Sequence, residues 1–220
     1  TPHLHPDGVR LGAASSVVAT GRPRAGTDGE RPMQLVVTGG SGFLGSHVID
    51  AARRRGHRVR SLDLLPSPWG SAADEEVLGD VRDAAVVAEA MTGADAVVHL
   101  AAVADLAAAN ADPDRAAAVN VDGTANVLAA AAAAGVPRLL HASSVYVHAR
   151  AGGAYRATKR RAEALVRDAA GPATTVLRFG SLYGPRADPG NAIRRILTQA
   201  LTEGRIEFWG DGTEVREYVH

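Results

Sequence analysis

The chain has 220 residues, with 24 basic and 24 acidic side chains and a formal net charge of zero. This length predicts one sizeable core, and the balanced charge excludes a general electrostatic attraction to nucleic acid or to an anionic membrane. Cysteine is absent, which excludes disulfides, zinc–thiolate sites and a cysteine nucleophile. Because no apolar run approaches the ~20 residues of a membrane span, we expect a cytoplasmic protein that binds neither membrane nor nucleic acid.

Residues 1–32 are rich in glycine and proline and show no sustained helical or strand period. This composition predicts a disordered leader, with the fold beginning at Met33. His3 and His5 have a spacing that metal ligands use, but no third ligand lies nearby. The remaining histidines do not complete a set either, so we expect no metal.

The first predicted element is a buried strand at residues 34–37, followed by a glycine-rich turn and a helix that ends at Gly56. The spacing of Gly39, Gly42 and Gly45 suits a dinucleotide: a tight turn, close approach of a pyrophosphate to the backbone, and close packing of helix on sheet. Free N–H groups at the helix N-terminus would then favour the phosphate charge.

A second strand at 57–64 contains Asp63, 18 residues after Gly45. An acid at this place accepts hydrogen bonds from the adenosine ribose and repels a 2′-phosphate, which favours NAD over NADP. The alternative is an aspartate that only caps the loop between a strand and a helix.

Strand and helix patterns continue to alternate along the chain. We predict a third strand at 76–79 that leads into Asp80 and Val81 beside the adenine, a helix at 83–91, a strand at 96–101, a helix at 116–134 and a strand at 138–143. This order predicts an α/β fold, a Rossmann-type doubly wound parallel sheet, with ligands at the carboxyl ends of the strands.

Several stretches resemble the extended short-chain dehydrogenase/reductase superfamily, in particular its NAD-dependent epimerase/dehydratase branch acting on nucleotide sugars. They are TGGSGFLGSH (38–47), GDV (79–81), HLAA (99–102), NVDGT (120–124), SSVYV (143–147), YRATK (155–159), LRFGSLYGPR (177–186) and WGDGTEVREYVH (209–220). The resemblance implies an NAD-binding domain at 33–180 and the start of a substrate-binding portion at 181–220. The cofactor-binding residues expected on these grounds are Gly39, Gly42, Phe43, Leu44, Gly45, Asp63, Asp80, Val81, Leu100, Ala101, Ala102, Asn120, Tyr155 and Lys159.

The expected catalytic residues are Ser144, Tyr155 and Lys159. Tyr155 and Lys159 are four residues apart and share a helix face, where a cation beside a phenol would lower the pKa of Tyr155 toward that of a general base. Lys159 is the only lysine among 24 basic residues, and arginine is a poor substitute for its compact ammonium. The resemblance implies that Tyr155 takes the hydroxyl proton, Lys159 holds the nicotinamide ribose and Ser144 orients the substrate. The alternative is a half-buried aromatic residue beside a solvated charge.

Two other residues carry an alternative of their own. Asn120 is expected near the cofactor, or else is a buried helix residue bonded to the backbone. Arg216 is expected to meet the nucleotide diphosphate through its bidentate fork, or else pairs with a neighbouring glutamate on the surface. Ser181 completes the expected substrate-binding set with Ser144 and Arg216, and His99 is expected in the core.

Within the branch, dehydratases carry Thr-Asp-Glu after the fifth strand, whereas this chain has Ser144-Val145-Tyr146. The missing carboxylate disfavours 4,6-dehydration, so the leading hypothesis is an NAD-dependent nucleotide-sugar epimerase that works through a transient keto-sugar. A decarboxylase or reductase of the branch, a reductase of a non-sugar alcohol, and a non-catalytic NAD-binding sensor stay open.

Only ten residues separate Ser144 from Tyr155, and the chain ends at His220, so we expect a truncated substrate portion. A homodimer through the alanine-rich stretch 116–134 is the alternative to burying that stretch in the core.

Overall fold

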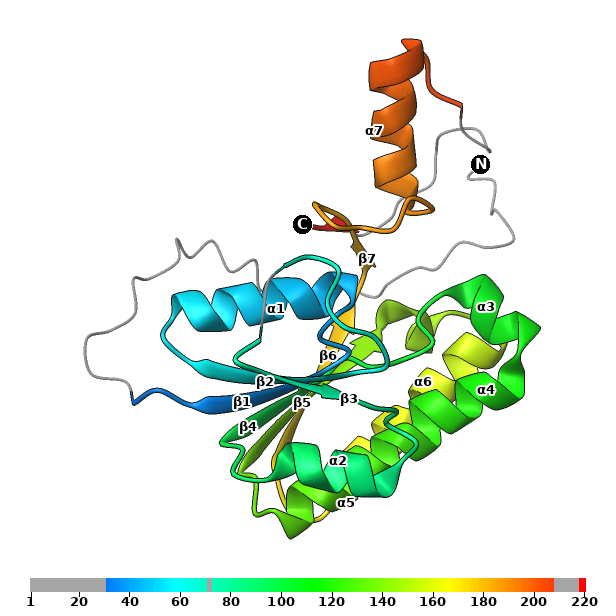
Figure 1. The fold of residues 1–220 in the computed structure, drawn as a ribbon. Helices are drawn as coiled ribbons and strands as arrows, with labels where there is room; N and C mark the ends of the chain where they lie inside the picture. Colours follow the sequence, from blue (N-terminus) through cyan, green and yellow to red (C-terminus); the bar gives the residue numbers. More distant parts are fainter. Residues whose placement is uncertain (1–30, 71–72, 208–217) are drawn as a thin grey trace, which may run out of the picture.

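The computed structural model describes residues 31–70, 73–207 and 218–220. Its centre is a six-stranded sheet in the order β3-β2-β1-β4-β5-β6, with every neighbouring pair parallel (Figure 1). The strands are β1 Gln34–Thr38, β2 Arg58–Asp63, β3 Glu75–Leu78, β4 Ala96–His99, β5 Arg138–Ser144 and β6 Ala173–Phe179. The chain crosses from β3 past β1 to β4, and this reversal of direction confirms the predicted doubly wound sheet.

Helices cover both faces of the sheet. Helix α1 lies on one face, and α2, α5 and α6 lie on the other (Figure 1). The helical segments are α1 Phe43–Arg54, α2 Ala84–Met91, α3 Leu106–Ala111, α4 Pro113–Ala117, the π-helical turn η1 Ala118–Asp122, α5 Gly123–Ala133, the 3-10 turn η2 Val145–His148, α6 Gly153–Asp168 and α7 Ala192–Glu203. A short pair, β7 Ser181–Leu182 and β8 Tyr218–Val219, forms a separate two-stranded sheet.

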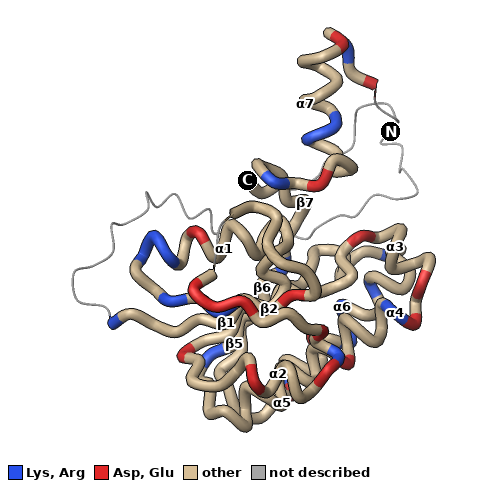
Figure 2. The backbone as a smooth tube through the Cα atoms, in the orientation of Figure 1, with Lys and Arg blue, Asp and Glu red and all other residues tan. Residues whose placement is uncertain are grey.

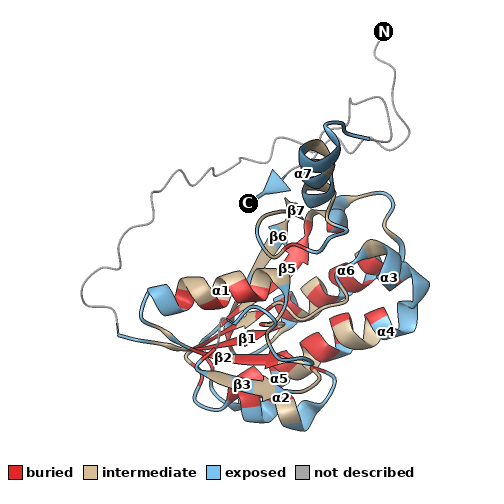
Figure 3. Cartoon of the chain, turned by 45° about the horizontal axis from the view of Figure 1, so that its top comes forward, coloured by how far each residue is buried: buried red, intermediate tan, exposed pale blue. Residues whose placement is uncertain are grey.

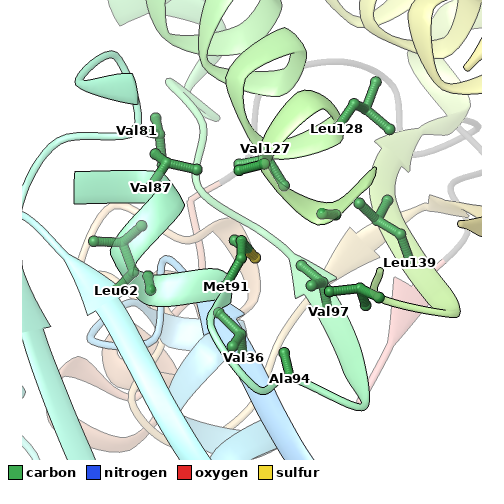
Figure 4. Packing of buried hydrophobic residues seen from close by; sticks show 14 of the residues in the cluster. Val36, Leu62, Val81, Val87, Met91, Ala94, Val97, Val127, Leu128 and Leu139 are labelled. Carbon is green, nitrogen blue, oxygen red and sulfur yellow. The ribbon is translucent and has the colours of Figure 1, made fainter. Parts of the chain in front are cut away.

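Burial on both faces explains why the central strands lack an alternating polar pattern. Val36 faces the cluster formed with α2 and α5, while Leu35 and Val37 face α1 and its Ile49. Figure 4 shows the larger cluster, in which strand valines meet Met91 of α2. Each such side chain contributes about 1.5–3 kcal/mol to stability when it is fully buried. The two clusters therefore fix the positions of the carboxyl ends of the strands.

The predicted helix at 116–134 is present but has a more complex form. It starts in α4, passes through the π-helical turn η1 and continues as α5. Several described elements were not predicted, among them α3, the edge strand β6, helix α7 and the short strands β7 and β8. The predicted strand at 96–101 ends earlier, at His99, because the Ala101 N–H turns away to the Thr38 hydroxyl (3.2 Å).

The described part of the chain carries charges of both signs. Acidic and basic residues are interspersed along helices α1, α4 and α7 (Figure 2). Within the described ranges, no helix combines the length and the apolar character that crossing a bilayer requires.

Candidate functional site: a dinucleotide cavity beside a serine, a tyrosine and a lysine

The glycine turn after β1 has the geometry that a dinucleotide needs. Gly39 adopts φ +73°, and a Cβ at this position would lie 2.8 Å from the Ala101 backbone nitrogen. A Cβ on Gly45 would lie 2.0 Å from the Gly39 carbonyl oxygen, so only glycine lets α1 pack on the turn. Gly42 is exposed and caps α1 without a side-chain hydrogen bond. The N–H groups of the first turn of α1, which begins with Phe43 and Leu44, are therefore open to an anion.

A cavity of about 180 Å³ lies at the carboxyl ends of the strands, next to this turn. It brings together predicted cofactor residues from four separate loops: Gly39, Asp63, Asp80, Val81, Leu100, Ala101 and Ala102. Arg115 also lines it, and sequence analysis missed this residue because no motif marks it. A larger hollow of about 380 Å³ lies between α5 and α6 and is lined mostly by alanine and leucine. We place the site at the smaller cavity, since the polar groups converge there.

Two acidic residues of the cavity are held by the chain itself. Asp63 accepts hydrogen bonds from the backbone N–H of Ser41 (3.0 Å) and of Leu65 (3.4 Å). These bonds tie the glycine turn to the end of β2, which is the loop-capping role given above as the alternative for Asp63. The carboxylate still has acceptor sites left for the hydroxyls of a ribose. Hydrogen bonds from Arg82 hold the pKa of Asp80 below its usual range, so this carboxylate stays ionised.

Asn120 sits in the π-helical turn η1 and is fully engaged with other parts of the chain. Its amide donates to the Val103 carbonyl (3.1 Å) and to the Thr158 hydroxyl (3.1 Å), and its oxygen accepts from the Val103 N–H (2.7 Å). These bonds match the alternative given for Asn120 in the sequence analysis, a buried helix residue bonded to the backbone. Asn120 therefore fixes the loop after β4 against α6, and a direct contact with the cofactor stays a prediction.

His99 is a core residue, as predicted. Its ring nitrogens lie 2.7 Å from the Thr38 hydroxyl and 2.9 Å from the Thr124 hydroxyl. Complete burial lowers the pKa of His99 well below its usual value, so the ring is neutral and links β1, β4 and α5.

The three predicted catalytic residues meet at the carboxyl end of β5. Ser144 ends that strand, where its hydroxyl accepts a hydrogen bond from the Tyr146 N–H (3.3 Å) and acts on the pKa of Tyr155 near the start of α6. One helical turn later, Lys159 donates to the Ala142 carbonyl (3.0 Å). All three are nearly inaccessible, with 6%, 8% and 5% of their surface exposed, which argues against the alternative of a solvated lysine.

The expected depression of the Tyr155 pKa by Lys159 is not found. Burial raises the pKa of Tyr155, the Tyr146 ring adds to this effect, and only the hydrogen bond with Ser144 opposes it. The physical reason is that Lys159 points its ammonium at the Ala142 carbonyl rather than at the phenol. Burial also lowers the pKa of Lys159, to about 8.

The predicted substrate side follows β6. Ser181 is half-buried and pairs with Tyr218 across the β7–β8 sheet. The ion pair of Arg186 with Asp50 of α1 (2.8 Å) anchors the Tyr-Gly-Pro-Arg loop. Arg216 and most of the stretch 209–220 lie outside the described residues, as do residues 1–30 of the expected leader.

The proteins to which this chain is similar differ in activity. The chain is 39% identical over 140 residues to a 3 beta-hydroxysteroid dehydrogenase/Delta 5-->4-isomerase of Mycobacterium tuberculosis, covering 61% of this chain and 35% of that protein. It is 33% identical over 216 residues to dTDP-glucose 4,6-dehydratase of the same organism, covering 86% of this chain and 65% of the relative. The chain thus spans between a third and two thirds of the length of these relatives.

Among solved structures, a UDP-glucose 4-epimerase of Thermotoga maritima with UDP-glucose superimposes with a TM-score of 0.74 at 28% identity. The match covers 85% of this chain and 69% of that one. A sequence model of the NAD dependent epimerase/dehydratase family matches residues 35–220. Three features of the site fit the NAD that this family uses. They are the glycines that leave no room for a Cβ atom, the N-terminus of α1 without a side-chain cap, and the aspartate at the end of β2. The chain therefore belongs to the NAD dependent epimerase/dehydratase family.

Proposed function

We propose that the protein is an NAD-dependent nucleotide-sugar epimerase that works through a transient keto-sugar. The observation that carries this proposal is the convergence of Ser144, Tyr155 and Lys159 at the end of β5, without a carboxylate in the loop that follows. A hydroxyl, a phenol and an ammonium suffice to remove and return one hydroxyl proton. Dehydration would also need an acid to protonate the departing hydroxyl, and Ser144-Val145-Tyr146 offers none.

In this mechanism each group of the chain has one task. The Ser144 hydroxyl orients the reacting sugar hydroxyl. Tyr155 accepts its proton and later returns it. Lys159 supplies a positive charge one helical turn after Tyr155 and would hold the nicotinamide ribose. Bound NAD supplies reversible oxidation of the sugar carbon, and Gly39, Gly45 and Asp63 would hold it in the cavity.

The test is proton NMR of a panel of nucleoside-diphosphate sugars incubated with the protein and NAD. We expect a new anomeric signal with one sugar, and its absence with Tyr155→Phe. Removal of a general base typically costs about 10²–10⁴-fold in rate, while NAD should still bind through the glycine turn and Asp63. A panel that gives no new signal, with NAD bound, would overturn the epimerase assignment.

A second candidate is a dehydrogenase of a non-sugar alcohol, since a relative with 39% identity is a hydroxysteroid dehydrogenase. Such an enzyme keeps the glycines and the Ser144, Tyr155 and Lys159 set but has no need of Arg216. Arg216→Ala should therefore abolish nucleotide-sugar binding in an epimerase and leave oxidation of a steroid alcohol unchanged in the alternative enzyme.

A further inference from the structure

A mostly buried carboxylate continues the row of functional side chains on α6. Glu163 follows Lys159 by one helical turn and Tyr155 by two, so the three side chains lie on one face of the helix. Only 13% of the Glu163 side chain is exposed. A carboxylate is costly to bury unless it is paired, and the structure shows how it is paired.

Arg178 of β6 holds both oxygens of this carboxylate. Its Nε donates to Oε1 (2.9 Å) and a terminal nitrogen donates to Oε2 (2.6 Å), a bidentate fork with a fixed geometry. Arg178 pairs with Ser143 of β5 in the sheet. The Lys159 ammonium bonds to the carbonyl of Ala142, the residue before Ser143. The carboxylate and the ammonium therefore reach the same short stretch of β5.

Lys159 is in a place that disfavours its charge. Its pKa is lowered to about 8 by burial, and the negative charge of Glu163 opposes that lowering. The other titratable groups near it are Tyr155 on α6, His141 on β5 and His99 on β4. Burial lowers the pKa of His141 to about 4 and that of His99 well below its usual value, so both rings are neutral near pH 7 and offer no anion. Among the described residues, Glu163 is the anion that acts on Lys159.

We propose that Glu163 is a positioning residue that keeps the buried Lys159 ammonium protonated, and that the fork of Arg178 holds the carboxylate in place for this task. The role of Lys159 in the reaction rests on the proposed function, whereas the charge state of Lys159 does not. The proposal can therefore fail or succeed independently of the epimerase assignment.

The chain offers an unusually clean measurement because Lys159 is its only lysine. Protein labelled with lysine carrying ¹³C at Cε gives a single side-chain signal, whose pH titration reports the protonation of Lys159 directly. In Glu163→Gln the amide still accepts a bond from Arg178, but the charge is gone. We expect the titration midpoint to fall, by up to about 1 pH unit, because a carboxylate one helical turn away favours the charged form of the lysine.

Asp168→Asn is the matched control. Asp168 lies on the same helix and is paired with Arg167, but both side chains are largely exposed, so solvent screens its charge and the Lys159 midpoint should not change. An equal shift in both variants, or no shift in Glu163→Gln, would overturn the proposal. If Glu163→Gln fails to fold, the double variant Glu163→Gln/Arg178→Gln removes both charges of the pair. The midpoint should again fall, but by less than in the single variant because a positive charge is lost as well, and an unchanged or higher midpoint would overturn the proposal.

Kinetics give an independent readout once a sugar substrate is in hand. The alkaline limb of the kcat profile should move to lower pH in Glu163→Gln, because Lys159 loses its proton earlier. Damage that is only structural would lower kcat equally at every pH, and such a result would contradict the assigned role.

Discussion

The six-stranded body and the segment after β6 differ in how far they bury their apolar side chains. In the body, both faces of the central strands are covered, and the buried residues gather in the sheet and in α1, α5 and α6 (Figure 3). Helix α7 is amphipathic but buries no residue, and Leu197 and Leu201 are 54% and 86% exposed. The comparison teaches that buried apolar contacts hold the six-stranded body together, whereas the described segment after β6 is joined to that body through polar contacts such as the ion pair of Arg186 with Asp50.

The largest expected effect falls on the glycine turn of the body. Gly45→Val would place a branched side chain against the Gly39 carbonyl oxygen, at 2.0 Å from the ideal Cβ, and the atoms it meets are backbone. We expect a loss of roughly 3 kcal/mol or more in the free energy of unfolding, measured by urea denaturation, together with loss of NAD binding. Gly56→Ala is the control, since Gly56 has φ +81° but open space around it, and its cost should be only about 1 kcal/mol.

The second effect is a dependence of the body's stability on pH. Burial lowers the pKa of His141 to about 4 from an ordinary value of 6.5, so the folded state binds this proton less readily than the unfolded chain. Stability is therefore full above about pH 6.5 and decreases as the pH falls toward 4, by roughly 3 kcal/mol. His99 acts in the same direction. Urea denaturation at a series of pH values should show this decrease, and His141→Leu should flatten it; an unchanged slope in the variant would refute the assignment.

The third effect concerns the link between the loop after β4 and α6. Asn120→Ala removes three hydrogen bonds and leaves the N–H and C=O of Val103 without their partner. We expect a loss of about 2 kcal/mol in the free energy of unfolding, since unsatisfied buried groups cost about 1–3 kcal/mol each. Asn126→Ala, whose amide bonds to the carbonyls of Val81 and Arg82, should cost less because that site is partly open to water. Equal losses in the two variants would contradict the central role of Asn120.

The smallest effect belongs to α7. Leu201→Ala changes a side chain that has no buried contact, so the free energy of unfolding should change by no more than about 0.5 kcal/mol. Val87→Ala in α2 removes a completely buried side chain and should cost about 2 kcal/mol. A loss as large in Leu201→Ala as in Val87→Ala would mean that α7 is packed, and would remove the contrast between the two halves.

Local patterns were sufficient for most of the body, for reasons visible at particular residues. Backbone atoms of the turn leave no room for a Cβ atom at Gly39 and Gly45, so the spacing of these glycines in the sequence predicts the turn. Asp83 caps α2 with its own side chain, and such a cap is a short-range signal. By contrast, β6 is an edge strand whose residues are only partly buried, and α3 is a single short turn after Asp105; neither has a strong period.

By itself, the sequence determined the doubly wound sheet, the glycine turn and several of the residues that line the cavity, because these depend on local propensity, on motifs and on apolar runs. Only the tertiary structure decided the charge states. The pKa of Tyr155 is raised rather than lowered, Asn120 bonds to the loop after β4, and Arg178 holds the carboxylate of Glu163. The physical reason is that burial and hydrogen-bond partners come from elements far apart in the chain, which no spacing of residues records.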